Sequence, residues 1–182
     1  ESIGNAGTLS IITNNLSVSN GAQVSSSTNG EGNGGTISIN ARGSVSVDGT
    51  SDNENAFTGV FSQVNSTGIG NSGQLSISTG NLSVTNGAQI SASTYGLGDG
   101  GAILINASES VVLEEGENNN FTSIYSNVGS DGIGNSGGVN IVAELLEVNR
   151  GGQIQSVVFG GKGNSGKIII DSNSISLDGR NS

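Results

Sequence analysis

Residues 69–94 read IGNSGQLSISTGNLSVTNGAQISAST, and this stretch decides the fold because the chain repeats it. Residues 3–28 read IGNAGTLSIITNNLSVSNGAQVSSST, and a more divergent copy begins at residue 133. The copies begin at residues 3, 69 and 133, so they are 66 and then 64 residues apart. Each repeat is a unit that cannot bury its apolar face alone. We therefore treat residues 1–182 as one segment with internal repeats 3–68, 69–132 and 133–182.

A shorter unit lies inside each repeat and is marked by a glycine-flanked turn such as Gly70-Asn-Ser-Gly73. Successive turns start 28, 38, 28, 36 and 29 residues apart. The unit is therefore about 28 residues long, and every second unit carries an insertion of about ten residues. The six turns begin at Gly4, Gly32, Gly70, Gly98, Gly134 and Gly163.

Apolar residues in each unit come in pairs at positions i and i+2, which is typical of a strand with one buried face. Within residues 69–94 these strands include positions 75–77, 82–84 and 90–92, and the last pair ends in a small residue. Parallel strands need a crossover connection, and here one complete turn of the chain supplies it with the usual right hand. The sequence therefore predicts an all-β fold, a right-handed parallel β-helix (solenoid) of about six coils of three short strands.

One polar position recurs at the same place in every turn. Asparagine side chains stacked at such a position hydrogen-bond to one another in cross-β structure. We expect a ladder in which the amides bond to each other or to neighbouring backbone, and we expect Asp99 to break it because a carboxylate cannot donate. The ladder residues are Asn5, Asn33, Asn71, Asp99, Asn135 and Asn164.

The charge and composition exclude several classes of function. Five Lys and Arg against 15 Asp and Glu give a net charge of −10, so no basic patch is available for nucleic-acid phosphates or an anionic membrane. No run reaches the roughly 18 apolar residues of a membrane-spanning helix. The chain has no cysteine and therefore no disulfide or thiolate chemistry. We expect neither a nucleic-acid partner nor membrane insertion.

Acidic residues in the two insertions are the candidate metal ligands, because Ca²⁺ prefers hard oxygen ligands. The alternative is a solvated, charged loop, which we favour because the acidic spacing differs between the insertions. We therefore expect no cofactor, and Ca²⁺ is the metal ion whose binding should be tested. Phe57 and Phe121 close the insertions, and we expect them to pack each loop base against the body. The candidates are Asp48, Asp52 and Glu54 in one insertion and Glu114, Glu115 and Glu117 in the other.

Catalysis has little support in the sequence. Polysaccharide lyases and hydrolases with β-helical folds use carboxylates with Lys or Arg in a groove. Here the cations of neighbouring coils are Arg150, Lys162 and Lys167, with Glu144 and Glu147 near in the sequence. No paired carboxylates occupy matched positions of adjacent coils, as glycoside hydrolysis would need. The G-x-G-x-x-G matches recur without a following helix, so they are turns and not a dinucleotide site.

The repeated pattern resembles a known family. It reads G-N-x-G-x-L-S-I-x-T-x-N-L-S-V-x-N-G-A-Q-I-S-A-S-T, followed by G-x-G-x-G-G-x-I-x-I-N-A. It is similar to the repeats of large filamentous-haemagglutinin-like exoproteins, particularly those of cyanobacteria, over essentially the whole chain and most closely over residues 69–107. The resemblance implies a β-helical shaft exported by two-partner secretion. The family's Asn-Pro-Asn motifs are not present in this proline-free sequence.

These observations together lead to one expected function and two alternatives. We expect a non-catalytic structural or adhesive shaft, extracellular or on the outer cell surface of a bacterium, and a segment of a longer repeat array. Its partners would be further coils of the same chain, neighbouring copies end to end, and host or matrix glycans. The first alternative is a carbohydrate-binding or polysaccharide-degrading β-helix. The second is an extracellular fibre that assembles end to end.

Overall fold

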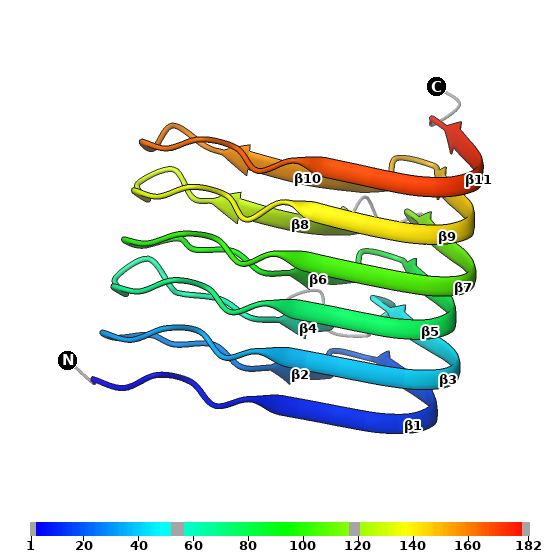
Figure 1. Cartoon of the computed structure of the whole chain (residues 1–182), viewed down its shortest axis with the longest axis horizontal. Coiled ribbons are helices and arrows are strands. Elements are labelled where there is room, and N and C mark those ends of the chain that lie inside the picture. Colours follow the sequence, from blue (N-terminus) through cyan, green and yellow to red (C-terminus); the bar gives the residue numbers. More distant parts are fainter. Residues whose placement is uncertain (1–2, 52–56, 117–120, 180–182) are drawn as a thin grey trace.

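The computed structural model describes residues 3–51, 57–116 and 121–179 of the 182-residue chain. These residues form eleven β-strands and no helix (Figure 1). Long strands alternate along the chain with short ones. The long strands are β1 (Leu9–Ser19), β3 (Ile37–Asp48), β5 (Leu75–Thr85), β7 (Ile103–Glu114), β9 (Val139–Asn149) and β11 (Ile168–Asp178). The short strands are β2 (Gln23–Ser25), β4 (Gly59–Phe61), β6 (Gln89–Ser91), β8 (Ser123–Val128) and β10 (Gln153–Val158).

The strands form two parallel sheets. The long strands make one sheet in the order β1-β3-β5-β7-β9-β11, and the short strands make the other in the order β2-β4-β6-β8-β10. The chain adds one strand to each sheet in turn, so a long strand and the short strand after it form one layer of a stack (Figure 1). This all-β arrangement of stacked parallel strands is consistent with a β-helix or solenoid-like fold.

The register places matched apolar residues of successive layers above one another. Leu9 pairs with Ile37, which pairs with Leu75, and the column continues through β7, β9 and β11. Ile37 and Leu75 are fully buried, as the pattern of one buried face predicted. The short strands also begin where the sequence indicated. Their apolar residues form a second column of Val24, Val60, Ile90, Ile124 and Ile154.

The prediction of three separate strands per coil was wrong in one respect. The first two predicted strands are one continuous strand that bends in the middle (Figure 1). At the bend β3 has two residues, Arg42 and Gly43, where β5 has only Gly80, so the register shifts there. A β-bulge of this kind leaves one residue unpaired and bends the strand without ending the ladder. The apolar alternation restarts after the bulge, which made one strand look like two.

Two-residue turns join the long and short strands in the layers that lack an insertion. Asn20 and Gly21 have φ angles of 56° and 78°, and the Ala22 amide donates to the Ser19 carbonyl at 3.0 Å. Two successive positive φ angles define the type I′ turn, which favours Asn-Gly. The same turn recurs at Asn86-Gly87, whereas Arg150-Gly151 places an arginine at a φ of 53°.

A column of glycines allows the layers to approach closely at the opposite end of each layer. Gly70 has a φ of 152°, and a Cβ there would lie 2.1 Å from the Gly32 carbonyl oxygen. At Gly98 the φ is 141° and the distance to the Gly70 carbonyl oxygen would be 2.0 Å. Only glycine fits such a contact, because any Cβ would overlap the neighbouring backbone. The turns that resemble a dinucleotide fingerprint are therefore the places where successive backbones touch.

Candidate functional site

Next to the glycine column, the six predicted ladder residues lie in one column of the structure. In the first five layers the side-chain oxygen accepts a hydrogen bond from the backbone N–H of the equivalent residue in the following layer. The Asn33 amide donates to Asn5 Oδ1 at 2.8 Å, and the Asn71 amide donates to Asn33 Oδ1 at 2.8 Å. In the same way, the Asp99 amide donates to Asn71 Oδ1 (2.8 Å), the Asn135 amide to Asp99 Oδ1 (2.6 Å) and the Asn164 amide to Asn135 Oδ1 (2.9 Å).

Asp99 does not break this column, contrary to the sequence-based expectation. The side chain in the column only has to accept, and a carboxylate oxygen accepts as well as an amide oxygen. Asp99 Oδ1 receives both the backbone amide of Asn135 and its side-chain Nδ2, the second at 3.2 Å. The ladder joins side chain to backbone, so the missing amide donor of Asp99 is not needed.

The candidate calcium ligands that the structure describes are not brought to one place. Asp48 ends β3 and Glu114 ends β7, so β5 lies between them in the sheet. Glu114 forms an ion pair with Arg150 at 3.5 Å, and Glu115 is buried. The described residues contain no group of three or more His, Cys, Asp or Glu that could hold a metal ion. The other three candidates, Asp52, Glu54 and Glu117, lie outside the described residues.

Asp48 instead organises the start of its insertion. Its Oδ1 accepts hydrogen bonds from the Thr50 amide (2.9 Å), from Thr50 Oγ1 (2.8 Å) and from Asn86 Nδ2 (2.9 Å). Burial acts to raise the pKa of the Asp48 carboxyl, but these hydrogen bonds stabilise the charged form and outweigh burial, so the pKa lies below its ordinary value. The carboxylate therefore links the insertion to the next layer.

The cationic residues considered for catalysis are also dispersed. Arg150 follows β9, whereas Lys167 precedes β11. Because β9 and β11 run parallel over 11 residues, these two side chains belong to opposite ends of the strand pair. Glu144 is exposed near the middle of β9, where its carboxylate accepts from Asn173. The structure thus forms no constellation of carboxylate and cation from these residues.

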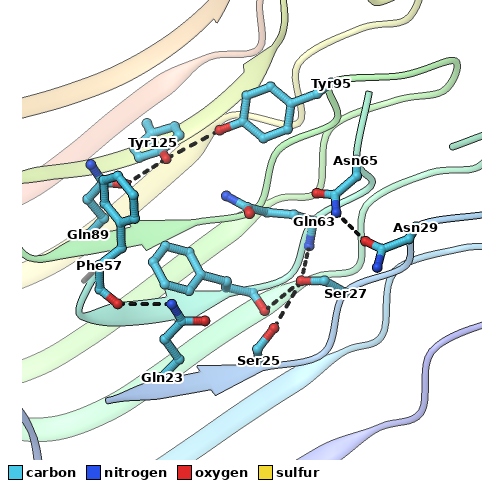
Figure 2. Close-up of a pocket in the computed structure, with 11 residues that line it drawn as sticks. Gln23, Ser25, Ser27, Asn29, Phe57, Gln63, Asn65, Gln89, Tyr95 and Tyr125 are labelled. Atoms are coloured by element: carbon cyan, nitrogen blue, oxygen red, sulfur yellow. Dashed lines mark hydrogen bonds between the residues drawn. The ribbon is translucent and has the colours of Figure 1, made fainter. Parts of the chain in front are cut away.

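A groove with a volume of about 550 Å³ lies on the outer face of the short-strand sheet. It crosses strands β2, β4, β6 and β8 along the direction of stacking. Figure 2 shows Tyr95 and Tyr125 together along one margin and Asn29 and Asn65 together along another. Four aromatic residues line it, namely Phe57, Phe61, Tyr95 and Tyr125. Five amides and two hydroxyls complete the lining, namely Gln23, Asn29, Gln63, Asn65, Gln89, Ser25 and Ser27.

Strand alternation places these side chains in the groove. Val24 and Ser26 point into the core, so Gln23, Ser25 and Ser27 point outward from the same segment. In the register of the sheet, Ser25 lies beside Phe61, Phe61 beside Ser91, and Ser91 beside Tyr125. Large and small side chains therefore alternate along this column, and the small ones leave the space that the rings border.

The polar groups of the groove are held by hydrogen bonds within it. Gln63 Nε2 donates to Ser91 Oγ at 3.0 Å, and Tyr125 Oη donates to Gln89 Oε1 at 2.9 Å. Tyr95 Oη lies 3.4 Å from Tyr125 Oη. Burial, and then the neighbouring Tyr125, raise the pKa of the Tyr95 phenol far above its ordinary value. Tyr95 therefore stays neutral, and the described lining includes no charged side chain.

Comparison with protein-family models, with curated proteins and with solved structures found no match. No helix capable of spanning a membrane occurs in the described part of the chain.

Sequence reasoning missed this groove. Phe57 was expected to pack a loop base against the body, but its side chain is 60% exposed, as is that of Phe121 at 62%, so that expectation was wrong. Phe57 instead borders the groove. A weak signal was available in the outward positions of the third strand, where Gln23, Gln63 and Gln89 occur in successive units. Amides at exposed strand positions are common, so the pattern alone did not indicate a site.

Proposed function

We propose that this chain is a non-catalytic structural and adhesive segment of a secreted or cell-surface filamentous protein, built as a right-handed parallel β-helix. The observation that carries the proposal is the uniform stacking. Every long strand is paired in parallel with the next, and the column from Asn5 to Asn164 hydrogen-bonds all six layers in one direction. Stability of this kind comes from contacts between neighbouring layers, so length can increase by adding repeats.

Strand β11, the outer strand of the long-strand sheet, presents apolar side chains on which a further layer can stack. Ile175 and Leu177 of β11 are 51% and 73% exposed, whereas the residues in register with them on β9, Leu146 and Val148, are buried and half-buried. An added layer would cover these side chains, whether it came from the same chain or from another copy. Burial of each aliphatic side chain contributes about 1.5–3 kcal/mol. The filamentous-haemagglutinin-like character and export by two-partner secretion remain part of this proposal, supported by the repeated sequence motif.

Insertion of one more copy of residues 69–132 after Gly132 tests the shaft. Two layers should be added, and the particle should lengthen by about 9.6 Å along the stack while its cross-section stays unchanged. Small-angle X-ray scattering measures both dimensions. An isotropic increase in size, or loss of the β-sheet circular dichroism signal, would contradict the proposed shaft.

Adhesion is tested separately with beads that carry the 182-residue protein. They should bind to extracellular matrix polysaccharide or to cell surfaces, and beads that carry an unrelated acidic protein of equal net charge should not. Equal retention of both kinds of bead would show that charge and not a specific surface causes binding. A reducing-sugar assay on the same polysaccharides distinguishes adhesion from degradation, because an adhesive segment releases no product.

A further inference from the structure

The groove on the short-strand sheet combines aromatic rings, of which Phe57 is the most exposed, with five amide side chains. A uniform shaft needs neither. Its volume of about 550 Å³ falls in the range of small-molecule sites, which is roughly 300–1,000 Å³. We infer that this groove binds a segment of a neutral oligosaccharide, with pyranose rings stacked on its aromatic side chains and hydroxyls bonded to its amides. This inference deepens the adhesive role proposed above and rests on it.

The aromatic residues supply stacking surfaces at a suitable spacing. Phe57, which is 60% exposed, lies directly before β4, and the partly exposed Tyr125 is on β8. The layer of β6 lies between their two layers, so the two positions are about 9.6 Å apart along the stack. Phe61 is only 6% exposed and lies at the bottom of the groove. The C–H groups on the face of a pyranose carry partial positive charge and suit the negative face of an aromatic ring. A chain of linked pyranoses lying along the stack would meet more than one ring.

The amides supply hydrogen bonds of both kinds. Gln23 Nε2 donates to the Phe57 carbonyl at 3.0 Å, and Gln63 Nε2 donates to Ser91, so among the described residues each glutamine keeps an unpaired Oε1 acceptor. Gln89 uses its Oε1 to accept from Tyr125 and keeps an unpaired Nε2 donor. Asn65 Nδ2 donates to Asn29 Oδ1, which leaves Asn65 Oδ1 as an acceptor and Asn29 Nδ2 as a donor.

This mixture fits hydroxyl groups better than other ligands. A sugar hydroxyl both donates and accepts, so it can use the free acceptor of one amide and the free donor of the next. The internal hydrogen bonds already fix these amides, so binding costs less side-chain entropy. Figure 2 shows the bonded halves of Gln89 and Asn65 directed at other groove residues.

Other ligand classes fit less well. An anionic ligand would meet no cation in the described lining and would be repelled by the net charge of −10. A peptide that binds by strand addition needs an unpaired sheet edge, but β4, β6 and β8 are each paired on both sides. β2 is an edge strand, and it contributes Gln23 and Ser25 to the groove through its outward face. A neutral ligand with many hydroxyls is the remaining class that uses both the rings and the amides.

The test uses a matched pair of phenylalanines. Phe57 and Phe121 occupy equivalent positions 64 residues apart and are similarly exposed, but only Phe57 is among the described groove residues. Neutral tetrasaccharides of glucose, xylose and N-acetylglucosamine are titrated into the 182-residue protein by calorimetry. We expect at least one to bind, F57A to weaken its affinity about tenfold, and F121A to leave it unchanged. Both variants should keep the melting temperature of the original chain, because both rings are exposed.

Each alternative outcome has a distinct meaning. Saccharide binding that F57A and F121A affect equally would overturn the groove as the site and leave the adhesive proposal in place. No binding of any probe at millimolar concentration, with bead adhesion retained, would overturn the inference alone, whereas loss of both would overturn the adhesive proposal as well. Dimerisation in sedimentation velocity that F57A abolishes would show that a second copy occupies the groove, which also overturns the inference.

Discussion

Replacement of Gly98 by alanine measures how much the close contact between layers contributes to stability. The alanine Cβ would lie 2.0 Å from the Gly70 carbonyl oxygen, whereas ordinary contact begins at 3.4 Å. The two turns must therefore separate by about 1.4 Å. The hydrogen bonds from the Gly70 amide to the Leu97 carbonyl (2.7 Å) and from the Asp99 amide to Asn71 Oδ1 (2.8 Å) would then exceed hydrogen-bonding range.

The loss of these two bonds should cost about 1–3 kcal/mol in total. An alanine at a φ of 141° adds a further cost of order 1–3 kcal/mol, independent of the neighbouring layer. Gly4 is the matched control, because its φ is 158° but a Cβ there would have no atom within 4 Å. We expect G98A to be about 1–3 kcal/mol less stable than G4A in urea denaturation followed by circular dichroism. Equal destabilisation by the two substitutions would refute the reasoning.

Three further predictions concern the columns and turns. Asn71→Ala should lower the free energy of unfolding by about 0.5–1.5 kcal/mol, because the Asp99 amide loses its acceptor. Asp99→Asn should change the free energy of unfolding little, because an amide oxygen also accepts. Urea denaturation of both variants measures these changes, and a large effect of Asp99→Asn would contradict a column in which the side chain only accepts. The pKa of Asp48 is lower in the folded protein than its ordinary value of 3.8. The contribution of its carboxylate to stability is therefore present above pH 3.8 and is lost as the pH falls through the folded pKa. Asp48→Asn should flatten the pH dependence of the melting temperature in that acid range, and an unchanged slope would contradict this role of Asp48. Arg150→Gly should raise the melting temperature followed by circular dichroism, because glycine adopts the φ of 53° without strain and the exposed ion pair to Glu114 contributes little. A lower melting temperature would show that the contacts of Arg150 contribute more than the relief of backbone strain.

The stacked fold could be predicted from the sequence because one repeated physical pattern determines it. Aliphatic residues at i and i+2, returning about every 28 residues, can be buried only if equivalent strands lie side by side. The register confirms this for Leu9, Ile37 and Leu75, which lie in one column. The positions of the six glycine-flanked turns were equally clear, because the motif recurs in every unit and its first glycine has a positive φ angle each time.

The details that sequence reasoning missed depend on which atoms meet. In β3 the bulge consists of one extra residue at Arg42-Gly43, whereas β9 and β11 pair through the same region without a register shift. The alternation of apolar residues looks the same whether a strand bends there or ends. The behaviour of Asp99 depends on the donor being a backbone N–H. The groove depends on Phe61, Ser91 and Tyr125, which come from three different layers, being in register. None of these is a property of a local stretch of sequence.

The one-way direction of the asparagine column makes the two faces of every layer chemically different. Each layer offers a side-chain oxygen toward the following layer and a backbone N–H toward the preceding one, as at Asn33 between Asn5 and Asn71. A layer that has just formed therefore already carries the acceptor that its successor needs. Folding from the amino-terminal side can therefore add each layer to a surface that already presents its acceptor. A successor in the reversed orientation would place one side-chain oxygen against another and would lose this hydrogen bond.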